Sequence, residues 1–204
     1  MGIIIVQEET TKDPISLIGR ESGVCYGSNV EDADKNYKRG LENIKSNHGR
    51  TLEFPQVYLV LDGWSAKVIR ELYTHIGGSP TRLQSSTRYI EYGDFEFVTP
   101  FTVLRNSETK ELYESTMANI SETIKRLESL GVPKEDSSML LPLGMTTKVV
   151  LRTNLRNLVD MSRQRMCNRA FWEFRGLFNE IAISLADYSP EWKTLINDLN
   201  LFAP

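Results

Sequence analysis

Thr153-Asn154-Leu155-Arg156-Asn157-Leu158 begins the longest helix that the sequence predicts, over about residues 153–187. From residue 152 to residue 175 the segment holds six arginines against only two acidic residues, Asp160 and Glu173. Arginine-rich helices are often only solvated faces. The placement of the charges around the helix therefore decides between a structural and a functional interpretation.

Two of these arginines share a side of the predicted helix with apolar residues. At about 100° per residue, Arg165 and Arg169 fall on an apolar-leaning side. The apolar residues of that side are Leu158, Met161 and Trp172. Burying a charge there is costly unless it meets an anion or a carboxylate, and guanidinium groups suit phosphates because their donors form a planar fork. The segment thus predicts a partly buried site for a phosphate-bearing small molecule.

The rest of the chain predicts short strands and helices. Strands are expected at residues 3–6 and 57–61, and extended structure at 88–99, where aromatic residues alternate. Asp62-Gly63 is expected to turn the chain into a helix capped by Ser65. The helices expected besides the long one cover residues 31–47, 65–73, 110–130 and 134–140. These elements and a glycine-rich loop predict an α+β fold, and residues 1–204 are expected to form a single domain.

Composition and charge exclude several classes of protein. Of the 204 residues, 40% are hydrophobic and 25% are charged, so the chain can bury a core and is not disordered. The net charge of −3 argues against a general nucleic-acid coat protein. No apolar run approaches the ~20 residues of a membrane span, and no signal peptide is recognisable. We expect a soluble, cytoplasmic protein with neither a membrane nor a nucleic-acid partner.

The cysteines and histidines do not form a metal-binding pattern. Cys25 and Cys167 are neither a CxxC pair nor a disulfide ladder. Only His48 and His75 could join them, so no metal site is expected.

Two further segments have recognisable patterns: the first suits an anionic ligand, and the second predicts a turn. Residues 77–89, Gly-Gly-Ser-Pro-Thr-Arg-Leu-Gln-Ser-Ser-Thr-Arg-Tyr, combine glycines that let a backbone approach a ligand with hydroxyl donors and two arginines. They form neither a Walker loop nor the GxGxxG dinucleotide fingerprint, and serine-rich loops are common. Residues 48–53, His-Gly-Arg-Thr-Leu-Glu, predict a turn before the strand at 57–61.

Three C-terminal stretches have the order and spacing of a known pattern. They are Gly131-Val132-Pro133-Lys134-Glu135, Leu141-Pro142-Leu143, and the stretch from Thr153 to Leu158, completed by Arg165 and residues 170–174. The pattern, roughly GVPxExAR, LP and TxNARxLxxFxxxR, is similar to that of the flavin-dependent thymidylate synthases. Residues 24–26, 48–49 and 64–72 also resemble segments of this family. The resemblance covers nearly the whole chain.

The family signature, RHRxxSxNExSxRY, is altered in this sequence. Its first triplet becomes Thr74-His75-Ile76, so only the histidine is kept. At its far end Ser86, Arg88 and Tyr89 match, whereas Gln84 replaces the glutamate and Leu83 the asparagine. The two ends are out of register by two residues, which implies a two-residue insertion around residues 77–80.

Other departures lie further along the chain. By the resemblance, Ser138 stands where the family's arginine contacts the nucleotide phosphate, and Asp160 where a flavin-contacting asparagine is common. These changes and the altered triplet remove three arginines from a site for two phosphorylated ligands. Arg82, in the inserted loop, is the candidate that restores one of the charges.

The resemblance implies a homotetramer in which FAD lies across subunits. A one-carbon unit would pass from methylenetetrahydrofolate to C5 of dUMP, with the hydride from NADPH. Arg165 would polarise the uracil as the catalytic residue. The implied flavin-binding residues are Thr51, Glu53, His75, Asn154 and Arg156. The implied nucleotide-binding residues are Arg82, Gln84, Ser86, Arg88 and Arg165.

Three alternatives stay open at this point. One is a sister enzyme on the same scaffold that adds a hydroxymethyl group or uses another pyrimidine nucleotide. Another is a flavin- or nucleotide-binding relative without turnover. The third is a nucleic-acid binder that uses the arginine-rich segment, which the acidic balance of the chain disfavours. The sequence separates neither methylation from hydroxymethylation nor FAD from FMN.

Overall fold

The computed structural model describes residues 2–46 and 48–203, which divide into two compact units. Unit 1 holds Asp62–Glu71, Gln84–Val149 and the N-terminal residues up to Ile3. Unit 2 holds Ile4–Leu61, Leu72–Leu83 and the C-terminal residues from Val150. The single domain expected for the whole chain stays a prediction.

Four strands form one antiparallel sheet in the order β1-β2-β4-β3. The strands are β1 (Ile3–Val6), β2 (Gln56–Ser65), β3 (Thr81–Gln84) and β4 (Thr146–Asn154). Backbone bonds continue the pairing past the strand ends, from Gln7 N to Tyr58 O at 2.9 Å and from Leu155 N to Pro55 O at 3.0 Å. Alternate residues of the two central strands are buried, as a sheet with one covered face requires.

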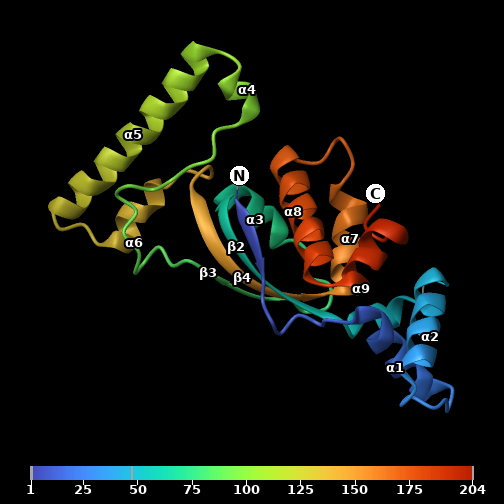
Figure 1. The fold of residues 1–204 in the computed structure, drawn as a ribbon. Helices are drawn as coiled ribbons and strands as arrows, with labels where there is room; N and C mark the ends of the chain where they lie inside the picture. The colour runs from blue at the N-terminus through green and yellow to red at the C-terminus, as the bar shows by residue number, and fades with distance from the viewer. Residues whose placement is uncertain (1, 47, 204) are drawn as a thin grey trace. The chain divides into compact units, whose positions relative to one another are not determined.

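Unit 1 carries a long helix, α5 (Ser107–Ser129), which Figure 1 draws in yellow-green. Asn106 caps its start by accepting a hydrogen bond from Glu108 N at 2.7 Å. Gly131, with φ +88°, reverses the chain after its end. The other helical elements of this unit are α3 (Ala66–Leu72, of which the last residue falls in unit 2), α4 (Phe101–Leu104), α6 (Lys134–Ser137) and the 3₁₀ turn η2 (Ser138–Leu140).

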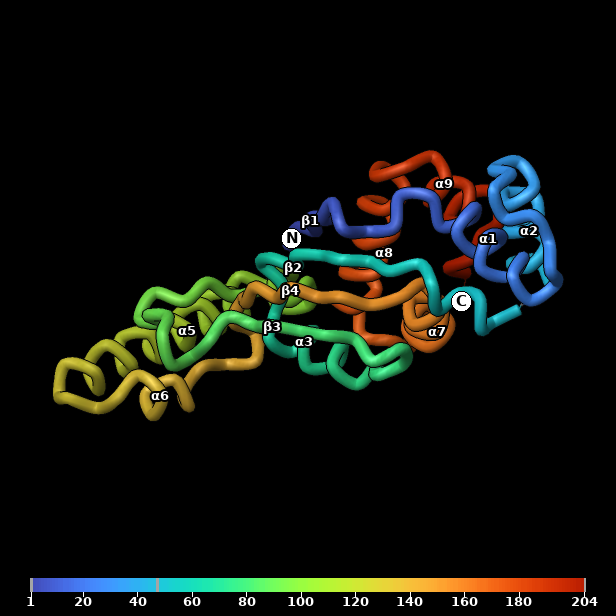
Figure 2. The backbone as a smooth tube through the Cα atoms, turned by 90° about the horizontal axis from the view of Figure 1, so that it is seen from below, coloured from blue at the N-terminus to red at the C-terminus, as the bar shows by residue number. Residues whose placement is uncertain are grey.

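Unit 2 is built mainly from helices. They are α1 (Pro14–Cys25), α2 (Ala33–Lys45), the 3₁₀ turn η1 (Gly49–Glu53), α7 (Leu155–Arg165), α8 (Trp172–Tyr188), α9 (Pro190–Lys193) and the π-helical turn η3 (Thr194–Asp198). Figure 2 shows α1 and α2 side by side. A Cβ at Gly19 of α1 would lie 1.7 Å from the carbonyl oxygen of Asn36 in α2, so this close approach requires glycine.

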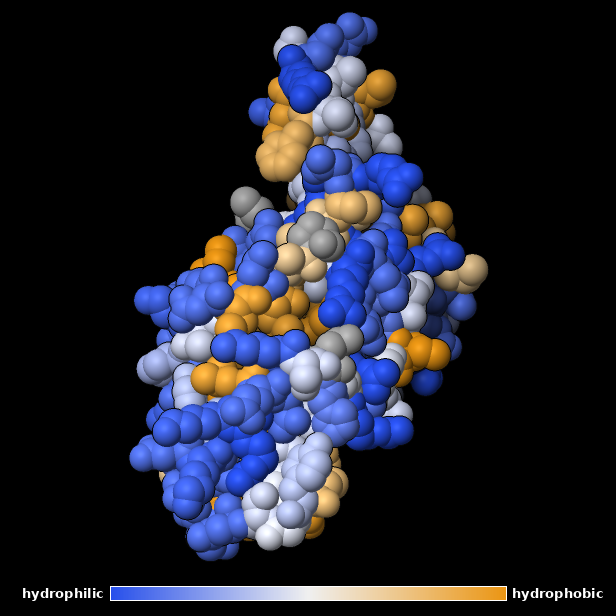
Figure 3. All heavy atoms as spheres, turned by 90° about the vertical axis from the view of Figure 1, so that its right-hand side faces the viewer, coloured by the Kyte–Doolittle hydropathy of each residue, from blue (hydrophilic) through white to orange (hydrophobic). Residues whose placement is uncertain are grey.

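Apolar side chains fill the interior of unit 2. In α8 the residues Phe174, Leu177, Phe178, Ile181 and Leu185 are buried at helical spacing. Large apolar side chains also stay exposed in this unit, and Figure 3 shows apolar patches between hydrophilic ones on one face. No helix in the described residues is long and apolar enough to cross a bilayer.

Most of the predicted elements are confirmed. The strands at 3–6 and 57–61 are β1 and part of β2, and the helices at 31–47, 110–130 and 134–140 are α2, α5 and α6 with η2. Residue 47, the last of the first predicted helix, lies outside the described residues. Ser65 caps α3 as expected, since its Oγ accepts a hydrogen bond from Val68 N at 3.1 Å. The α+β class is confirmed as well.

The prediction of one long helix over residues 153–187 is wrong. Thr153 and Asn154 end β4, α7 ends at Arg165, and α8 begins only at Trp172. In the turn between the helices, Ala170 N donates to Cys167 O at 3.0 Å. Arg169 therefore lies outside both helices, and the shared helix side inferred from the sequence applies to Arg165 alone.

Two local predictions are also wrong. Asp62-Gly63 does not end the strand, because β2 continues to Ser65 with Gly63 at φ +75°. Residues 88–99 form turns and a single bridge from Phe97 to Met145 instead of a strand. The aromatic rings there pack on one another and on α5: Phe97 lies 6.0 Å from the ring of Tyr113.

Candidate active site

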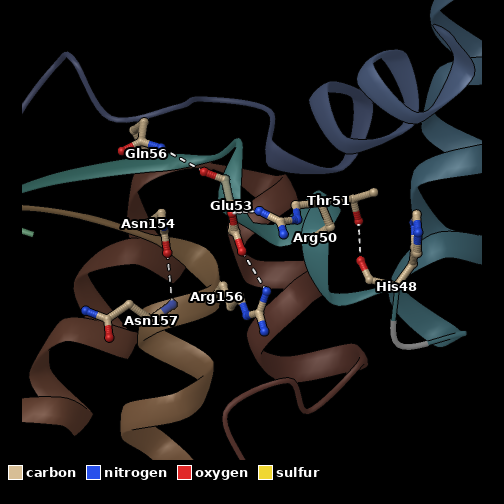
Figure 4. Close-up of polar contacts among 8 residues, drawn as sticks. All are labelled: His48, Arg50, Thr51, Glu53, Gln56, Asn154, Arg156 and Asn157. Atoms are coloured by element: carbon tan, nitrogen blue, oxygen red, sulfur yellow. Dashed lines mark hydrogen bonds and ion pairs between the residues drawn. The ribbon is translucent and has the colours of Figure 1, made fainter. Parts of the chain in front are cut away.

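A cluster of charged and polar residues surrounds Glu53 at the end of η1 (Figure 4). Its carboxylate oxygens meet two guanidinium groups: Oε1 lies 2.6 Å from Nη1 of Arg156, and Oε2 lies 3.3 Å from Nη1 of Arg50. Thr51 is buried, and its hydroxyl donates to His48 O at 2.7 Å, which closes the turn. Two positive charges against one carboxylate leave a net positive charge at this end of unit 2.

Asn154 joins this cluster at the first turn of α7. It is buried, and its Oδ1 accepts a hydrogen bond from Asn157 N at 2.9 Å as the helix cap. The loop after α3 packs on it, because a Cβ at Gly78 would lie only 2.0 Å from Asn154 Nδ2. Three predicted flavin-binding residues, Glu53, Asn154 and Arg156, are thus brought together around the start of α7.

A second cluster forms at the other end of α7, where Arg165 meets the loop after α3. Nε of Arg165 donates to His75 Nε2 at 3.2 Å, and Nη2 donates to Thr74 Oγ1 at 3.3 Å. The guanidinium carbon lies 5.5 Å from the ring centroid of Phe174. His75 accepts at Nε2, so that nitrogen carries no proton and the imidazole is neutral.

The electrostatics of His75 agree with a neutral ring. Burial lowers the pKa of His75 below its ordinary value, and the charges of Arg165 and Arg82 lower it further. The carboxylate of Asp160 acts in the opposite direction. Two guanidinium charges and one carboxylate near a neutral histidine leave a net positive charge, which favours an anionic ligand.

Arg82 lies in β3, and not in a loop as the sequence suggested. Its guanidinium carbon stands 4.7 Å from the ring centroid of Tyr73, a cation–π contact. No carboxylate in the described part of the chain forms a salt bridge with it. Burial raises the pKa of Tyr73, so the phenol stays protonated next to this charge.

The other predicted nucleotide-binding residues belong to unit 1. Nε2 of Gln84 donates to Thr147 Oγ1 at 3.2 Å, and Ser86 Oγ accepts from Arg88 N at 3.2 Å. The side chain of Arg88 forms a salt bridge with Glu135 at 2.8 Å. These residues lie along one short segment, and their guanidinium and hydroxyl groups stay at or near the surface.

Sequence reasoning missed several members of these clusters. Arg50 and Gln56 flank the predicted Glu53, and Tyr73 directly precedes the triplet that the signature singled out. The available signal was that they lie close in the sequence to predicted residues. Their side-chain partners could not be predicted, because these partners are brought together only by the tertiary fold. The described residues hold no group of three or more His, Cys, Asp or Glu side chains placed to bind a metal ion.

The turn after Arg165 contains a thiol. Cys167 and Cys25 are both free cysteines. A backbone hydrogen bond from Arg169 lowers the pKa of the Cys167 thiol, with further contributions from Ala170 N–H and from the Arg169 charge.

Comparison with known proteins decides the family. The model of the family described as "Thymidylate synthase complementing protein" matches residues 8–191. The chain belongs to this family. The family predicted from the C-terminal pattern and the altered signature is therefore confirmed.

Its curated relatives are flavin-dependent thymidylate synthases. The protein of Clostridium tetani is 25% identical over 213 residues, covering 93% of this chain and 85% of its own length. The protein of Geobacter sulfurreducens is 29% identical over 190 residues, covering 89% and 80%. The protein of Pyrococcus furiosus is 32% identical over 178 residues, covering 81% and 71%.

Two solved structures share the fold. A UMP/dUMP methylase of Streptomyces cacaoi, bound with 5-Br dUMP, has a TM-score of 0.78 at 14% identity and covers 100% of this chain and 98% of that chain. Thymidylate synthase X of Helicobacter pylori, with FAD and dUMP, has a TM-score of 0.70 at 20% identity, with coverage of 97% and 98%.

The Glu53 cluster fits the flavin that the resemblance implies. FAD carries a pyrophosphate, and anions of this kind bind where guanidinium groups and a helix N-terminus converge. Arg50 and Arg156 supply two guanidinium groups, and α7, a helix of 11 residues, begins beside them. This donor set, with its excess of positive charge, suits an anionic group.

Proposed function

We propose that the protein transfers a one-carbon unit from methylenetetrahydrofolate to C5 of dUMP and so forms dTMP, with FAD as cofactor and NADPH as hydride donor. The observation that carries this proposal is the family match over residues 8–191. The two positive clusters of unit 2 support it. Glu53 and Arg156, proposed for the flavin, meet at the start of α7. At the other end of this helix Arg165, proposed for the nucleotide, contacts His75, which is proposed for the flavin.

Arg165 is the proposed catalytic residue. Its guanidinium is oriented by hydrogen bonds to His75 and Thr74, so it is fixed before a substrate arrives. A preorganised donor at a uracil carbonyl stabilises the negative charge that builds on the ring as C5 becomes nucleophilic. The neutral state of His75 keeps its Nε2 available as the acceptor that holds Arg165.

The proposed nucleotide phosphate site uses Arg82, supported by the positive field around His75. Gln84, Ser86 and Arg88 are proposed to complete nucleotide binding. Arg88 would exchange its present salt bridge with Glu135 for the nucleotide. That pair is exposed, and exposed pairs contribute only about 0–1 kcal/mol, so the exchange costs little.

The proposed flavin-binding residues are Thr51, Glu53, His75, Asn154 and Arg156. When bound, FAD supplies the redox chemistry that no side chain of the protein can perform. We also propose a homotetramer, which the resemblance suggests and the exposed apolar side chains of Phe54, Ile76 and Leu83 support. The expected cytoplasmic location stays a prediction.

A second candidate is a sister enzyme that uses UMP or attaches a hydroxymethyl group. It is favoured by the altered signature triplet Thr74-His75-Ile76 and by the fold shared with a UMP/dUMP methylase. Both candidates need the same two clusters. The structure of the site therefore does not distinguish them, whereas the identity of the reaction product does.

One experiment tests both candidates. The purified protein is incubated with methylenetetrahydrofolate, NADPH and either dUMP or UMP, and the product is identified by mass spectrometry. dTMP supports the first candidate, and a hydroxymethylated nucleotide or a product from UMP supports the second. A protein that takes up no flavin and forms no product contradicts both and favours a non-catalytic relative or a nucleic-acid binder.

A further inference from the structure

Arg152, near the end of β4, connects two segments that sequence reasoning left without a link. Its Nη2 donates to the backbone carbonyl of Ser79 at 3.0 Å and to Thr81 Oγ1 at 3.2 Å. These contacts tie the guanidinium to both ends of the short stretch that follows Gly78. The residue has no role in the proposed reaction.

The same guanidinium reaches toward η1 on its other side. Nη1 of Arg152 lies 3.4 Å from Gln56 Oε1, and Gln56 Nε2 donates to the backbone carbonyl of Glu53 at 2.9 Å. Figure 4 shows Gln56 beside Glu53 in the cluster around the start of α7. Arg152 and Gln56 thus join the loop at residues 77–81 to the turn that carries Glu53.

The loop that Arg152 holds lies against Asn154. At Gly78, with φ +68°, a Cβ would come within 2.0 Å of Asn154 Nδ2, and at Gly77 it would come within 3.0 Å of Asn157 Oδ1. Ser79 also has a positive φ, 50°. The two glycines give the loop many competing conformations, and a serine at positive φ is strained. An anchor is therefore needed to keep the loop in one conformation.

We propose that Arg152 is a positioning residue for the cofactor site. Its guanidinium fixes the loop at residues 77–81 on one side and, through Gln56, η1 on the other, so that Asn154 and Glu53 are in place before FAD binds. All its acceptors are neutral, so a planar fork with several donors is required and a charge alone does not suffice. The inference rests on the proposed function, because it deepens the use of the same flavin site.

Two variants of Arg152 separate geometry from charge. Arg152→Ala removes the anchor, and Arg152→Lys keeps the charge but cannot bridge the loop and Gln56 together. We expect both to bind FAD roughly tenfold more weakly than the wild type, a change of about 1.4 kcal/mol in binding free energy, because ordering the site is then added to the cost of binding. Arg163→Ala, an exposed arginine on α7, is the control and should bind FAD as the wild type does.

An independent pair of variants tests whether the packing of the loop on Asn154 controls FAD binding. Gly78→Ala strains a positive φ and clashes with Asn154, whereas Gly27→Ala strains a similar φ of +60° with nothing within 4 Å of its Cβ. FAD affinity should fall in Gly78→Ala and not in Gly27→Ala. This comparison holds even if an Arg152 variant fails to fold.

Two readouts are measured on the full-length chain: FAD affinity, by titration after removal of bound flavin, and hydrogen–deuterium exchange of residues 77–81 without added FAD. If the proposal is right, residues 77–81 exchange faster in Arg152→Ala and Arg152→Lys than in the wild type, and both variants bind FAD more weakly. Wild-type FAD affinity in both variants overturns it, as does unchanged exchange in the loop. If Arg152→Lys alone behaves as the wild type, charge and not positioning is responsible. A wild type that binds no FAD overturns the proposed function as well, so the two failures are distinguishable.

Discussion

Replacing Arg165 by alanine should separate catalysis from folding more clearly than any other single change. The variant removes the guanidinium that donates to His75 and Thr74. A preorganised donor at a developing oxyanion is worth roughly 3–4 kcal/mol, so we expect kcat to fall by about 10²- to 10³-fold.

The expected effect on stability is smaller. The lost contacts include two hydrogen bonds of a half-buried side chain, at 3.2 and 3.3 Å, with a net contribution of about 1 kcal/mol each, and the contact with the Phe174 ring. For a chain of this size, a loss of 1–2 kcal/mol lowers Tm by only about 2–8 °C. At room temperature the variant should therefore stay folded and keep its flavin while its turnover collapses.

The assay measures dTMP formation at saturating substrates, with thermal unfolding and the flavin spectrum recorded on the same preparations. Arg165→Lys tests the planar fork, since a lysine keeps the charge but cannot contact His75 and Thr74 together; we expect it to recover only part of the rate. Arg163→Ala removes an exposed arginine from the same helix and should leave kcat unchanged. Full turnover in Arg165→Ala would refute the assignment of this residue to catalysis.

Arg82→Ala should weaken dUMP binding by at least about tenfold, since a charge-assisted contact contributes about 1.5–3 kcal/mol, and should leave deoxyuridine binding unchanged; calorimetric titration of both ligands checks this. His75 has a lowered pKa, through burial and then the charges of Arg165 and Arg82, so the unfolded chain binds more protons. The protein should therefore lose stability as the pH falls from 6.5, the ordinary pKa of histidine, toward the lowered pKa. The free energy of unfolding, measured with urea over that range, should not show this loss in His75→Gln. Gly19→Ala should cost about 1–3 kcal/mol by forcing α1 and α2 apart, whereas Gly27→Ala, which meets no neighbour, should melt at a higher temperature than Gly19→Ala.

The sequence predicted those elements whose signals are local. Ser65 as a cap, Gly131 as a helix end and the apolar run at residues 57–61 each act through neighbours in the chain, and each appears in the structure as expected. The family pattern around Asn154 and Arg156 likewise needed no tertiary information, and both residues lie at the start of α7, although the predicted helix began two residues too early.

Elements that depend on distant partners were missed or misplaced. In α1, Gly19 and Gly23 lower helix propensity, and only the close approach of α2 explains why glycine is needed there. β4 alternates as a strand should, but its arginine-rich continuation made residues 153 and 154 resemble the start of a helix. Likewise, no local pattern pairs Arg152 with Ser79 or Arg82 with Tyr73, because these contacts form only when the chain has folded.

The thiol in the turn between α7 and α8 gives the protein a natural attachment point for a reporter group. Because its pKa is lowered, Cys167 should react with a maleimide dye at lower pH than an ordinary thiol does. It lies two residues beyond Arg165, so a fluorophore there would sense movement of the turn when a nucleotide engages that guanidinium. A Cys25→Ser background leaves one thiol to label, and ligand binding could then be followed in real time by fluorescence without any added reporter residue.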